Sequence, residues 1–308
     1  MTISTQARDF INSGIPVSAH ETLTSENIES VRAQTLDIYR PAINYAMENY
    51  VGEKSIQIIG GVECMEILPE KPAPHLSNCV LLYFFGGGFI QGSPEEDLAI
   101  SGYICRKLGI RVIAPYYRRS PEVSCPCAIN DGFQVYRALC SDQSTSRLLI
   151  AGESAGGNLT LEILLQALNQ NLPVPGACVL MSPWCDLEHS GDSEKANNGR
   201  DPTLTLEYVE NAAQLYAAGQ ATRDWKVSPL NADFDSRFPP TMITTGTRDL
   251  LMSQCIRLSD KLLKAGVKVN LRIWEEMWHV FEFYPHIPEG TQSLSEICQF
   301  LESHLLTD

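Results

Sequence analysis

One pentapeptide, Gly-Glu-Ser-Ala-Gly at residues 152–156, constrains the fold of this chain more than any other stretch. An apolar run at 148–151 precedes it with the length of a buried strand, and apolar residues at helical spacing follow it to about Asn169. A strand that turns into a helix through Gly-x-Ser-x-Gly holds its serine in a strained bend that only glycine neighbours tolerate. The helix N-terminus behind the serine favours developing negative charge. The sequence therefore predicts a nucleophilic hydroxyl at Ser154.

Apolar runs and turn signals alternate along much of the chain. Two alternating runs at 55–59 and 62–68 predict paired strands at a sheet edge, and the apolar run 79–84 predicts a strand covered on both faces. Further strands are expected at 111–115 and 177–184, both buried, and at 241–245 and 269–274, with helices at 131–140, 204–218, 253–265 and 291–306. Strands separated by helices of this length predict an α/β fold with a mostly parallel central sheet flanked by helices.

Residues 93–96 carry a clear signal for the N-terminus of a helix. Ser93, Pro94 and Glu96 have the residue types of an N-cap, a first helical position and the third position of a capping box. We therefore expect a helix from Ser93 to Gly109.

Two regions break the alternation of strands and helices. Residues 1 to about 50 carry only helical patterns, including a second short piece that begins at Pro41, and a packing arm or a lid would explain them equally well. The second region, about 186–225, lies between two predicted strands and is a candidate piece of a cap. A chain of 308 residues can still form one large domain.

Charge and composition narrow the class of protein. The formal net charge is −14 and no basic cluster is present, which excludes nucleic acid as a partner. The first residues lack the pattern of a secretory signal, and no apolar run approaches the roughly 18 residues of a membrane span. Ten cysteines are scattered singly apart from Cys125 and Cys127, which indicates reduced thiols. These features predict a cytoplasmic protein without a membrane span.

Three consecutive glycines, 86–88, follow the apolar strand at 79–84. Glycine loses much conformational entropy on folding, so the backbone must do something there that side chains would prevent. A bare tight turn is one role, and backbone amides presented to an oxyanion are another. A serine nucleophile elsewhere in the chain favours the second role.

A serine hydroxyl needs a base to activate it and an acid to orient that base. Of the six histidines, His279 follows the last predicted strand at the same sheet edge as the serine, and we favour it over His286. Asp249 occupies the loop after the preceding strand, whereas Asp260 falls inside a helix and Asp186 has a structural interpretation. The order serine, aspartate, histidine is that of α/β hydrolases.

Taken together, these motifs resemble the bacterial members of the hormone-sensitive lipase family of α/β-hydrolase esterases. The matching pieces stand in family order between about residues 80 and 283: Gly86-Gly87-Gly88-Phe89, residues 117–122, residues 152–159, Ser182-Pro183-Trp184 with Asp186-Leu187, Asp249-Leu250, and residues 278–281. The resemblance implies one α/β-hydrolase domain over residues 1–308, with a helical cap from about 1–50 and about 186–225. It also implies an oxyanion hole made by the amides of Gly87, Gly88 and Ala155.

The resemblance further implies a serine carboxylesterase that needs no cofactor or metal and hydrolyses short- to medium-chain esters through an acyl-enzyme on Ser154. Lactones would suit the same site, and a homodimer is common among relatives. Two alternatives stay open: a small-molecule sensor, because some relatives have lost the histidine, and an amidase or deacetylase of a specific metabolite. Phe89, Trp184 and Trp278 are expected either in the substrate pocket or in the core.

The chain departs from the family pattern at several positions. Phe85 replaces the usual histidine before the glycines, which removes a hydrogen-bonding brace, although an apolar side chain can pack beneath the loop instead. Arg119 and Ser120 stand where Leu-Ala is usual, and Glu122 is expected to pair with Arg119 or its neighbour Arg118. Glu153 replaces the common aspartate before the nucleophile.

Overall fold

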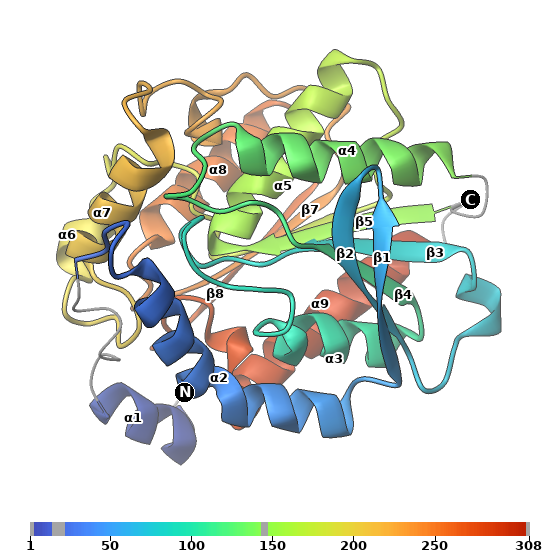
Figure 1. The fold of residues 1–308 in the computed structure, drawn as a ribbon, viewed down its shortest axis with the longest axis horizontal. Coiled ribbons are helices and arrows are strands. Elements are labelled where there is room, and N and C mark those ends of the chain that lie inside the picture. Colours follow the sequence, from blue (N-terminus) through green and yellow to red (C-terminus); the bar gives the residue numbers. More distant parts are fainter. Residues whose placement is uncertain (1–2, 14–21, 143–146, 306–308) are drawn as a thin grey trace.

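An eight-stranded sheet runs through the protein, with helices on both of its faces (Figure 1). The computed structural model describes residues 3–13, 22–142 and 147–305. The strand order is β1-β2-β4-β3-β5-β6-β7-β8. The strands are β1 (Glu53–Ile59), β2 (Val62–Leu68), β3 (Cys79–Phe84), β4 (Arg111–Pro115), β5 (Arg147–Glu153), β6 (Cys178–Met181), β7 (Thr241–Gly246) and β8 (Val269–Trp274).

The pairing of the strands agrees with the sequence patterns. β1 pairs with β2, and β2 with β4, in antiparallel fashion, and every later pair from β4 to β8 is parallel. All six residues of β3 are buried, as their continuous apolar run predicts for a central strand. The predicted α/β fold, with a mostly parallel sheet and an antiparallel pair at one edge, is confirmed.

The helices form a layer on each face of the sheet. One layer holds α4 (Cys127–Ser141), α5 (Ser154–Asn169) and α8 (Met252–Lys264), and the other holds α3 (Leu98–Leu108) and α9 (Pro288–Leu305) (Figure 1). The helix α2 (Ile28–Asn49) packs along α3. Pro41 lies inside α2, so the predicted separate piece after Pro41 is wrong. A proline removes one backbone donor, but the packing of α2 on α3 supports a continuous helix.

The helix expected from Ser93 begins five residues later, at Leu98, after the N-cap Asp97. Ser93 and Glu96 do contact each other, and one of the two capping-box hydrogen bonds is present, since the Glu96 amide donates to Ser93 Oγ (3.4 Å). The second contact differs from that of a capping box, because the Ser93 hydroxyl, and not its backbone amide, donates to Glu96 Oε1 (3.0 Å). The intervening residues form turns rather than a helix. The capping signal therefore closes a local loop, whereas Gly109, at φ +66°, ends the helix as predicted.

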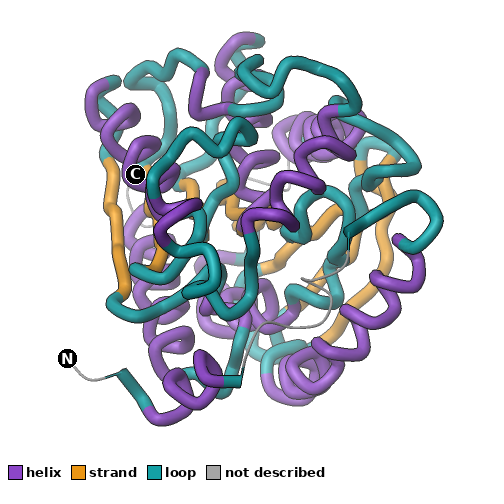
Figure 2. Tube along the Cα trace, turned by 90° about the vertical axis from the view of Figure 1, so that its left-hand side faces the viewer, coloured by secondary structure: helices purple, strands orange, loops and turns teal. Residues whose placement is uncertain are grey.

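The two irregular regions of the sequence meet at one end of the molecule. The helices α1 (Thr5–Asn12), α6 (Ser193–Ala196) and α7 (Leu206–Ala217) lie at the left of Figure 1 beside the start of α2. Figure 2 views this end and shows helices and loops in front of the strands. No helix in the described part of the chain has both the length and the apolar character needed to cross a bilayer.

Candidate active site

The predicted bend between β5 and α5 places Ser154 at the first position of the helix. Its backbone has φ +51°, a left-handed conformation that is strained for a residue with a side chain. A Cβ atom added to Gly152 would lie 2.2 Å from the Gly156 carbonyl oxygen, and one added to Gly156 would lie 2.1 Å from the Phe84 carbonyl oxygen. Only glycine fits at these two positions, so the pentapeptide is required by the close approach of the backbone.

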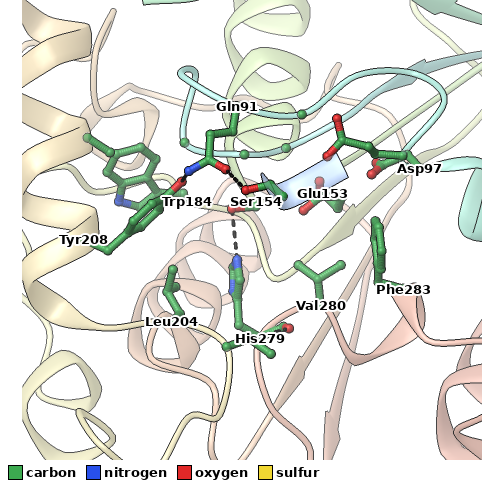
Figure 3. Close-up of a pocket in the computed structure, with 18 of the residues that line it drawn as sticks. Gln91, Asp97, Glu153, Ser154, Trp184, Leu204, Tyr208, His279, Val280 and Phe283 are labelled. Atoms are coloured by element: carbon green, nitrogen blue, oxygen red, sulfur yellow. Dashed lines mark hydrogen bonds between the residues drawn. The ribbon is translucent and has the colours of Figure 1, made fainter. Parts of the chain in front are cut away.

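His279 lies within hydrogen-bonding distance of Ser154 (Figure 3). The distance from His279 Nε2 to Ser154 Oγ is 2.9 Å, and the distance from His279 Nδ1 to Asp249 Oδ1 is 3.1 Å. His279 follows β8, and Asp249 lies between β7 and α8, so both come from loops at the end of the sheet where β5 turns into α5. The structure thus brings together the three side chains that the sequence singled out.

The charge states of His279 and Asp249 follow from their burial and from the contact between them. Burial lowers the pKa of His279, but the carboxylate of Asp249 and its hydrogen bond more than offset this, so the pKa lies above its ordinary value. Burial likewise raises the pKa of Asp249, yet His279 and the hydroxyl of Thr245, which donates to Asp249 Oδ2 (2.7 Å), bring the net pKa below the ordinary range. The aspartate is therefore ionised and stabilises a cationic imidazole.

A buried carboxylate that the sequence analysis missed, Asp201, joins the loops of the acid and the base. Asp201 Oδ2 accepts hydrogen bonds from the backbone amides of His279 (3.1 Å) and Leu250 (3.0 Å). Its Oδ1 accepts from the backbone amide and the hydroxyl of Thr203, both at 2.9 Å. Burial and the charge of Asp249 raise the pKa of Asp201 to about 6. Its sequence neighbours do not mark it for the site, because the two loops that it joins lie 49 and 78 positions away.

The glycine loop runs across the pocket in front of Ser154 (Figure 3). The Gly87 carbonyl accepts from the amides of Ile90 (3.1 Å) and Gln91 (2.8 Å), which turns the loop back on itself. Among the hydrogen bonds of the described residues, none has the Gly87 or Gly88 amide as its donor. These two amides are therefore available to a ligand in the pocket.

Phe85 packs beneath this loop in place of the family's histidine. Its ring stacks on Tyr117 with 4.1 Å between centroids, and a Cβ atom added to Gly92 would lie 2.8 Å from the ring. Tyr117 Oη donates to the carbonyls of Phe85 (2.7 Å) and Gly86 (3.2 Å). A tyrosine hydroxyl thus braces the loop from below, and the phenylalanine fills the space around it.

The pocket beside Ser154 is a cavity of about 120 Å³. Trp184 lies in its wall, whereas Phe89 and Trp278 do not line it. Phe89 is fully buried and stacks on Tyr216 at 3.7 Å. Trp278 is also fully buried and stacks on Phe10 of α1 at 4.5 Å. The pocket role considered for Phe89 and Trp278 is therefore wrong, because both side chains are used in packing.

A pair of carboxyl groups, Asp97 and Glu153, forms part of the pocket wall (Figure 3). Asp97 Oδ2 accepts from the Tyr83 hydroxyl (2.7 Å), and burial raises the pKa of Asp97 to about 7. Burial and the neighbouring Asp97 raise the pKa of Glu153 well above its ordinary value. A Cβ atom on Gly86 would lie 2.1 Å from Glu153 Oε1, so this carboxyl group supports the start of the glycine loop.

The pairing predicted for Glu122 is wrong. Glu122 accepts from Arg32 of α2, Nη2 to Oε2 at 2.9 Å, rather than from Arg118 or Arg119. Arg118 binds Asp131, with 2.8 Å between Nη2 and Oδ1, and Arg119 donates to a backbone carbonyl. The prediction rested on arginines that are close to Glu122 in sequence, whereas its actual partner, Arg32, is 90 positions away.

Gln91 connects the glycine loop to helices of both irregular regions. Its Oε1 accepts from Thr35 of α2 (2.7 Å), and its Nε2 donates to the hydroxyl of Tyr208 of α7 (3.1 Å) (Figure 3). Gln91 has no role that its sequence neighbours indicate, since only the fold brings its partners together.

The rival residues lie elsewhere. Asp186 is buried and forms an ion pair with Arg257 (2.8 Å), as its structural interpretation predicts, and Asp260 pairs with Lys264 on an exposed helix face (2.6 Å). His286 lies 6.3 Å from Phe10 between ring centroids and does not line the Ser154 pocket. Of the other histidines, His75, His189 and His304 are likewise outside that pocket, and His20 lies outside the described residues.

Neither a cluster of metal-ligating side chains nor a disulfide is present in the described ranges 3–13, 22–142 and 147–305. Within them, no group of three or more His, Cys, Asp or Glu side chains is placed to hold a metal ion. All ten cysteines are free thiols, eight of them buried.

Comparison with known proteins places this geometry in a family. A family model described as "alpha/beta hydrolase fold" matches residues 81–283. The crystal structure of an esterase from the bacterial hormone-sensitive lipase family superposes with a TM-score of 0.85 at 28% identity, with 99% of each chain covered. The chain belongs to the hormone-sensitive lipase family of α/β hydrolases.

Two relatives with substantial identity to this chain are named for ester or acetyl hydrolysis. The chain is 33% identical over 225 residues to an acetyl-hydrolase of Streptomyces hygroscopicus, covering 72% of this chain and 75% of that protein. It is 30% identical over 271 residues to an esterase of Acinetobacter venetianus, covering 86% and 88%. This member of the hormone-sensitive lipase family is therefore a carboxylic ester hydrolase, and the resemblance found in the sequence is confirmed.

Proposed function

We propose that the enzyme hydrolyses short- to medium-chain carboxylic esters through an acyl-enzyme on Ser154. One observation carries the proposal: Ser154 Oγ, the two ring nitrogens of His279 and Asp249 Oδ1 form a continuous chain of contacts of 2.9 and 3.1 Å. This is the arrangement by which an imidazole activates a hydroxyl while a carboxylate fixes its tautomer.

In the first half of the reaction, Ser154 Oγ attacks the ester carbonyl carbon and its proton passes to His279 Nε2. Asp249 holds Nδ1–H and stabilises the imidazolium that forms. The tetrahedral intermediate then collapses, the bond to the alcohol oxygen breaks, and His279 returns the proton to that oxygen. In the second half, a water molecule gives its proton to His279 and attacks the acyl-enzyme, which releases the carboxylic acid and restores the serine.

In this proposal the backbone amides of Gly87, Gly88 and Ala155 donate hydrogen bonds to the oxyanion of the tetrahedral intermediate. The first two donate to no other group among the described residues, and Ala155 stands at the N-terminus of α5, where the helix dipole favours negative charge. One such donor is typically worth about 3 kcal/mol of transition-state stabilisation.

We further propose that residues 1–50 and 186–225 act together as the cap over this site. Thr35 and Tyr39 of α2 line the pocket, as do Tyr208 and Val209 of α7. The bridge through Gln91 attaches both helices to the loop that carries the proposed oxyanion donors. Closing the cap would then exclude water and align the donors in one step.

The substrate range is inferred from the pocket and the relatives. A cavity of about 120 Å³ is small compared with the roughly 300–1,000 Å³ of sites for drug-sized ligands, which favours a short acyl group beside Ser154. The relatives named for acetyl and ethyl acetate hydrolysis support the same choice for this chain. Lactones and activated amides present the same carbonyl carbon, so they belong in the substrate panel.

A sensor role is disfavoured by the contact between His279 and Ser154. A binding protein gains nothing from an imidazole 2.9 Å from a strained serine hydroxyl, whereas catalysis requires it. Tight binding of an ester without turnover would reverse this choice.

The test is turnover of p-nitrophenyl acetate and butyrate by wild type, Ser154→Ala and His279→Ala. We expect each variant to lower kcat by several orders of magnitude with an unchanged circular dichroism spectrum. His304→Ala, on the last helix and away from the pocket, is the matched control and should retain full activity. A fluorophosphonate should add its mass to a peptide containing Ser154, and labelling at another serine would contradict the assignment.

A further inference from the structure

A second, apolar groove lies on the outer side of the Ser154 pocket. It has a volume of about 510 Å³ and is bounded by Phe10 of α1, by Ile38, Ala42 and Tyr45 of α2, and by the segment around Tyr284. None of its lining residues is a lysine, an arginine or an acid. Ile38 and Tyr45 are each 45% exposed, so this part of the enzyme presents apolar surface to solvent. Apolar surface gathered in a groove marks a binding site more often than scattered residues do.

Two tyrosines separate the groove from the pocket. Tyr39 and Tyr284 line both spaces, and their hydroxyls are hydrogen-bonded to each other. The ring of Phe283 packs on Tyr39 with 4.5 Å between centroids. Both tyrosines are only partly buried, so each presents one side to the groove. The wall between the two spaces is therefore made of aromatic side chains, which can change rotamer without moving the backbone.

The volumes of the inner pocket and the groove suit different parts of one ester substrate. The inner pocket of about 120 Å³ accommodates the reacting carbonyl with a short substituent, and the groove of about 510 Å³ accommodates a longer chain.

We propose that the groove holds the apolar chain of the ester, on the side remote from the scissile carbonyl, and that the Tyr39–Tyr284 pair is the passage to it. This rests on the proposed function of Ser154. The shared tyrosine wall argues for a substrate chain as the occupant, since the same two side chains, Tyr39 and Tyr284, line both the groove and the site where the carbonyl reacts. Burying one methylene is worth about 0.8 kcal/mol, which is roughly fourfold in kcat/KM per methylene.

The test fills the groove without touching the pocket. Ala42→Trp places an indole in the groove, and Ala33→Trp makes the same change at an exposed position of α2 that borders neither space. The probes are p-nitrophenyl acetate against p-nitrophenyl octanoate for the acyl side, and ethyl acetate against octyl acetate for the alcohol side. The series that responds identifies which side of the ester enters the groove.

We expect Ala42→Trp to lower the ratio of long-chain to short-chain kcat/KM by roughly fifteen- to sixtyfold in one series, the loss of two to three methylene contacts. Acetate turnover should stay within about twofold of wild type, and Ala33→Trp should change neither ratio. Should Ala42→Trp fold poorly, Ile38→Asn, which makes the groove polar, is expected to lower the same ratio. An unchanged ratio in both series for both groove variants would overturn the proposal.

Failure of the groove and failure of the proposed function give different results. A wild-type enzyme that cleaves acetate but is more than a hundredfold slower on both eight-carbon esters would overturn the groove and leave Ser154 in place. No turnover of any ester would overturn the proposed function itself. Dimerisation that is abolished by Ala42→Trp with chain-length ratios unchanged would show that a second copy, rather than a substrate chain, occupies the groove.

Discussion

Replacing Asp201 by asparagine tests whether this carboxylate positions the proposed base and sets its pKa. The substitution keeps the shape of the side chain and removes its charge. If the NH2 group of the asparagine faces the backbone N–H groups of His279 and Leu250, which now donate to Asp201 Oδ2 at 3.1 and 3.0 Å, it cannot accept their hydrogen bonds, and the loop that carries His279 has to shift. In the opposite orientation the asparagine loses the hydrogen bonds that the amides of Thr203 and Leu204 donate to Oδ1.

Two effects on stability oppose each other. Burial raises the pKa of Asp201 from 3.8 to about 6, so the charged side chain costs the folded state about 3 kcal/mol above pH 6, and asparagine removes that cost. Losing two hydrogen bonds to a charged acceptor costs about 1.5–3 kcal/mol each. The net loss of roughly 0–3 kcal/mol is less than the 5–15 kcal/mol that typically stabilises a domain, so the variant should be folded.

Asp201→Asn should shift the pH dependence of activity in one direction, toward lower pH. With its pKa near 6, Asp201 is charged over the range in which His279 titrates, and its negative charge raises the pKa of His279. Removing it should move the acid limb of the kcat/KM profile to lower pH by about half a unit to one unit. The shifted loop should also lower the plateau of kcat/KM by roughly ten- to a hundredfold.

The assay is the pH dependence of p-nitrophenyl acetate hydrolysis, together with urea unfolding. Asp186→Asn is the matched control: it removes another buried aspartate charge from the same insertion, where Asp186 pairs with Arg257. It should lower stability without moving the acid limb. An Asp201→Asn profile with an unmoved acid limb and a plateau within twofold of wild type would refute the reasoning.

Three further substitutions follow from contacts around the glycine loop. Phe85→His should keep activity within about fivefold. It should lower the free energy of unfolding, measured with urea, by about 1–3 kcal/mol, because a polar imidazole replaces a phenyl ring that is only 1% exposed and stacks on Tyr117. A large gain in activity would show that the wild-type loop is poorly organised. Since the folded pKa of Asp97, about 7, lies above its ordinary 3.8, the native state holds a proton that the unfolded chain releases, and this contribution to stability is lost as pH rises from about 4 to 7. Asp97→Asn should therefore gain stability relative to wild type between pH 5 and pH 8, and a constant difference in urea unfolding at the two pH values would count against the raised pKa. Gln91→Leu should raise KM for butyrate esters about tenfold, because both cap helices lose their attachment to the loop, and an unchanged KM would argue against the cap.

The parts of the site that depend on local backbone geometry could be predicted from sequence. The bend at Ser154 is fixed by Gly152 and Gly156, whose neighbours leave no space for a Cβ atom, so the motif marks its own conformation. Asp249 and His279 could be chosen because parallel strands end at one edge of the sheet, which converts chain order into spatial proximity.

The parts that depend on contacts between distant segments could not be predicted. Glu122 pairs with Arg32 of another helix rather than with the arginines beside it, and the capping residues at Ser93 close a turn because the helix itself begins at Leu98. Asp201 stands in a segment whose sequence indicates only a polar loop, yet it is fully buried and accepts hydrogen bonds from two other loops, those of Leu250 and His279. The cap limits, the oxyanion amides, the possible dimer and the absence of a cofactor stay predictions.

The stacking of Phe10 on Trp278 has a consequence for how this enzyme loses activity. The helix α1 has eight residues, of which only Ala7 is buried. Besides this aromatic contact it is held by Phe10 against Tyr284, by the partly buried Ile3 and Ile11, and by the bonds of Ser4 to Glu289. Segments with so few buried groups open locally long before a sheet of eight strands melts. Trp278 immediately precedes the proposed base, so gentle warming would inactivate the molecule reversibly while its secondary structure was still intact.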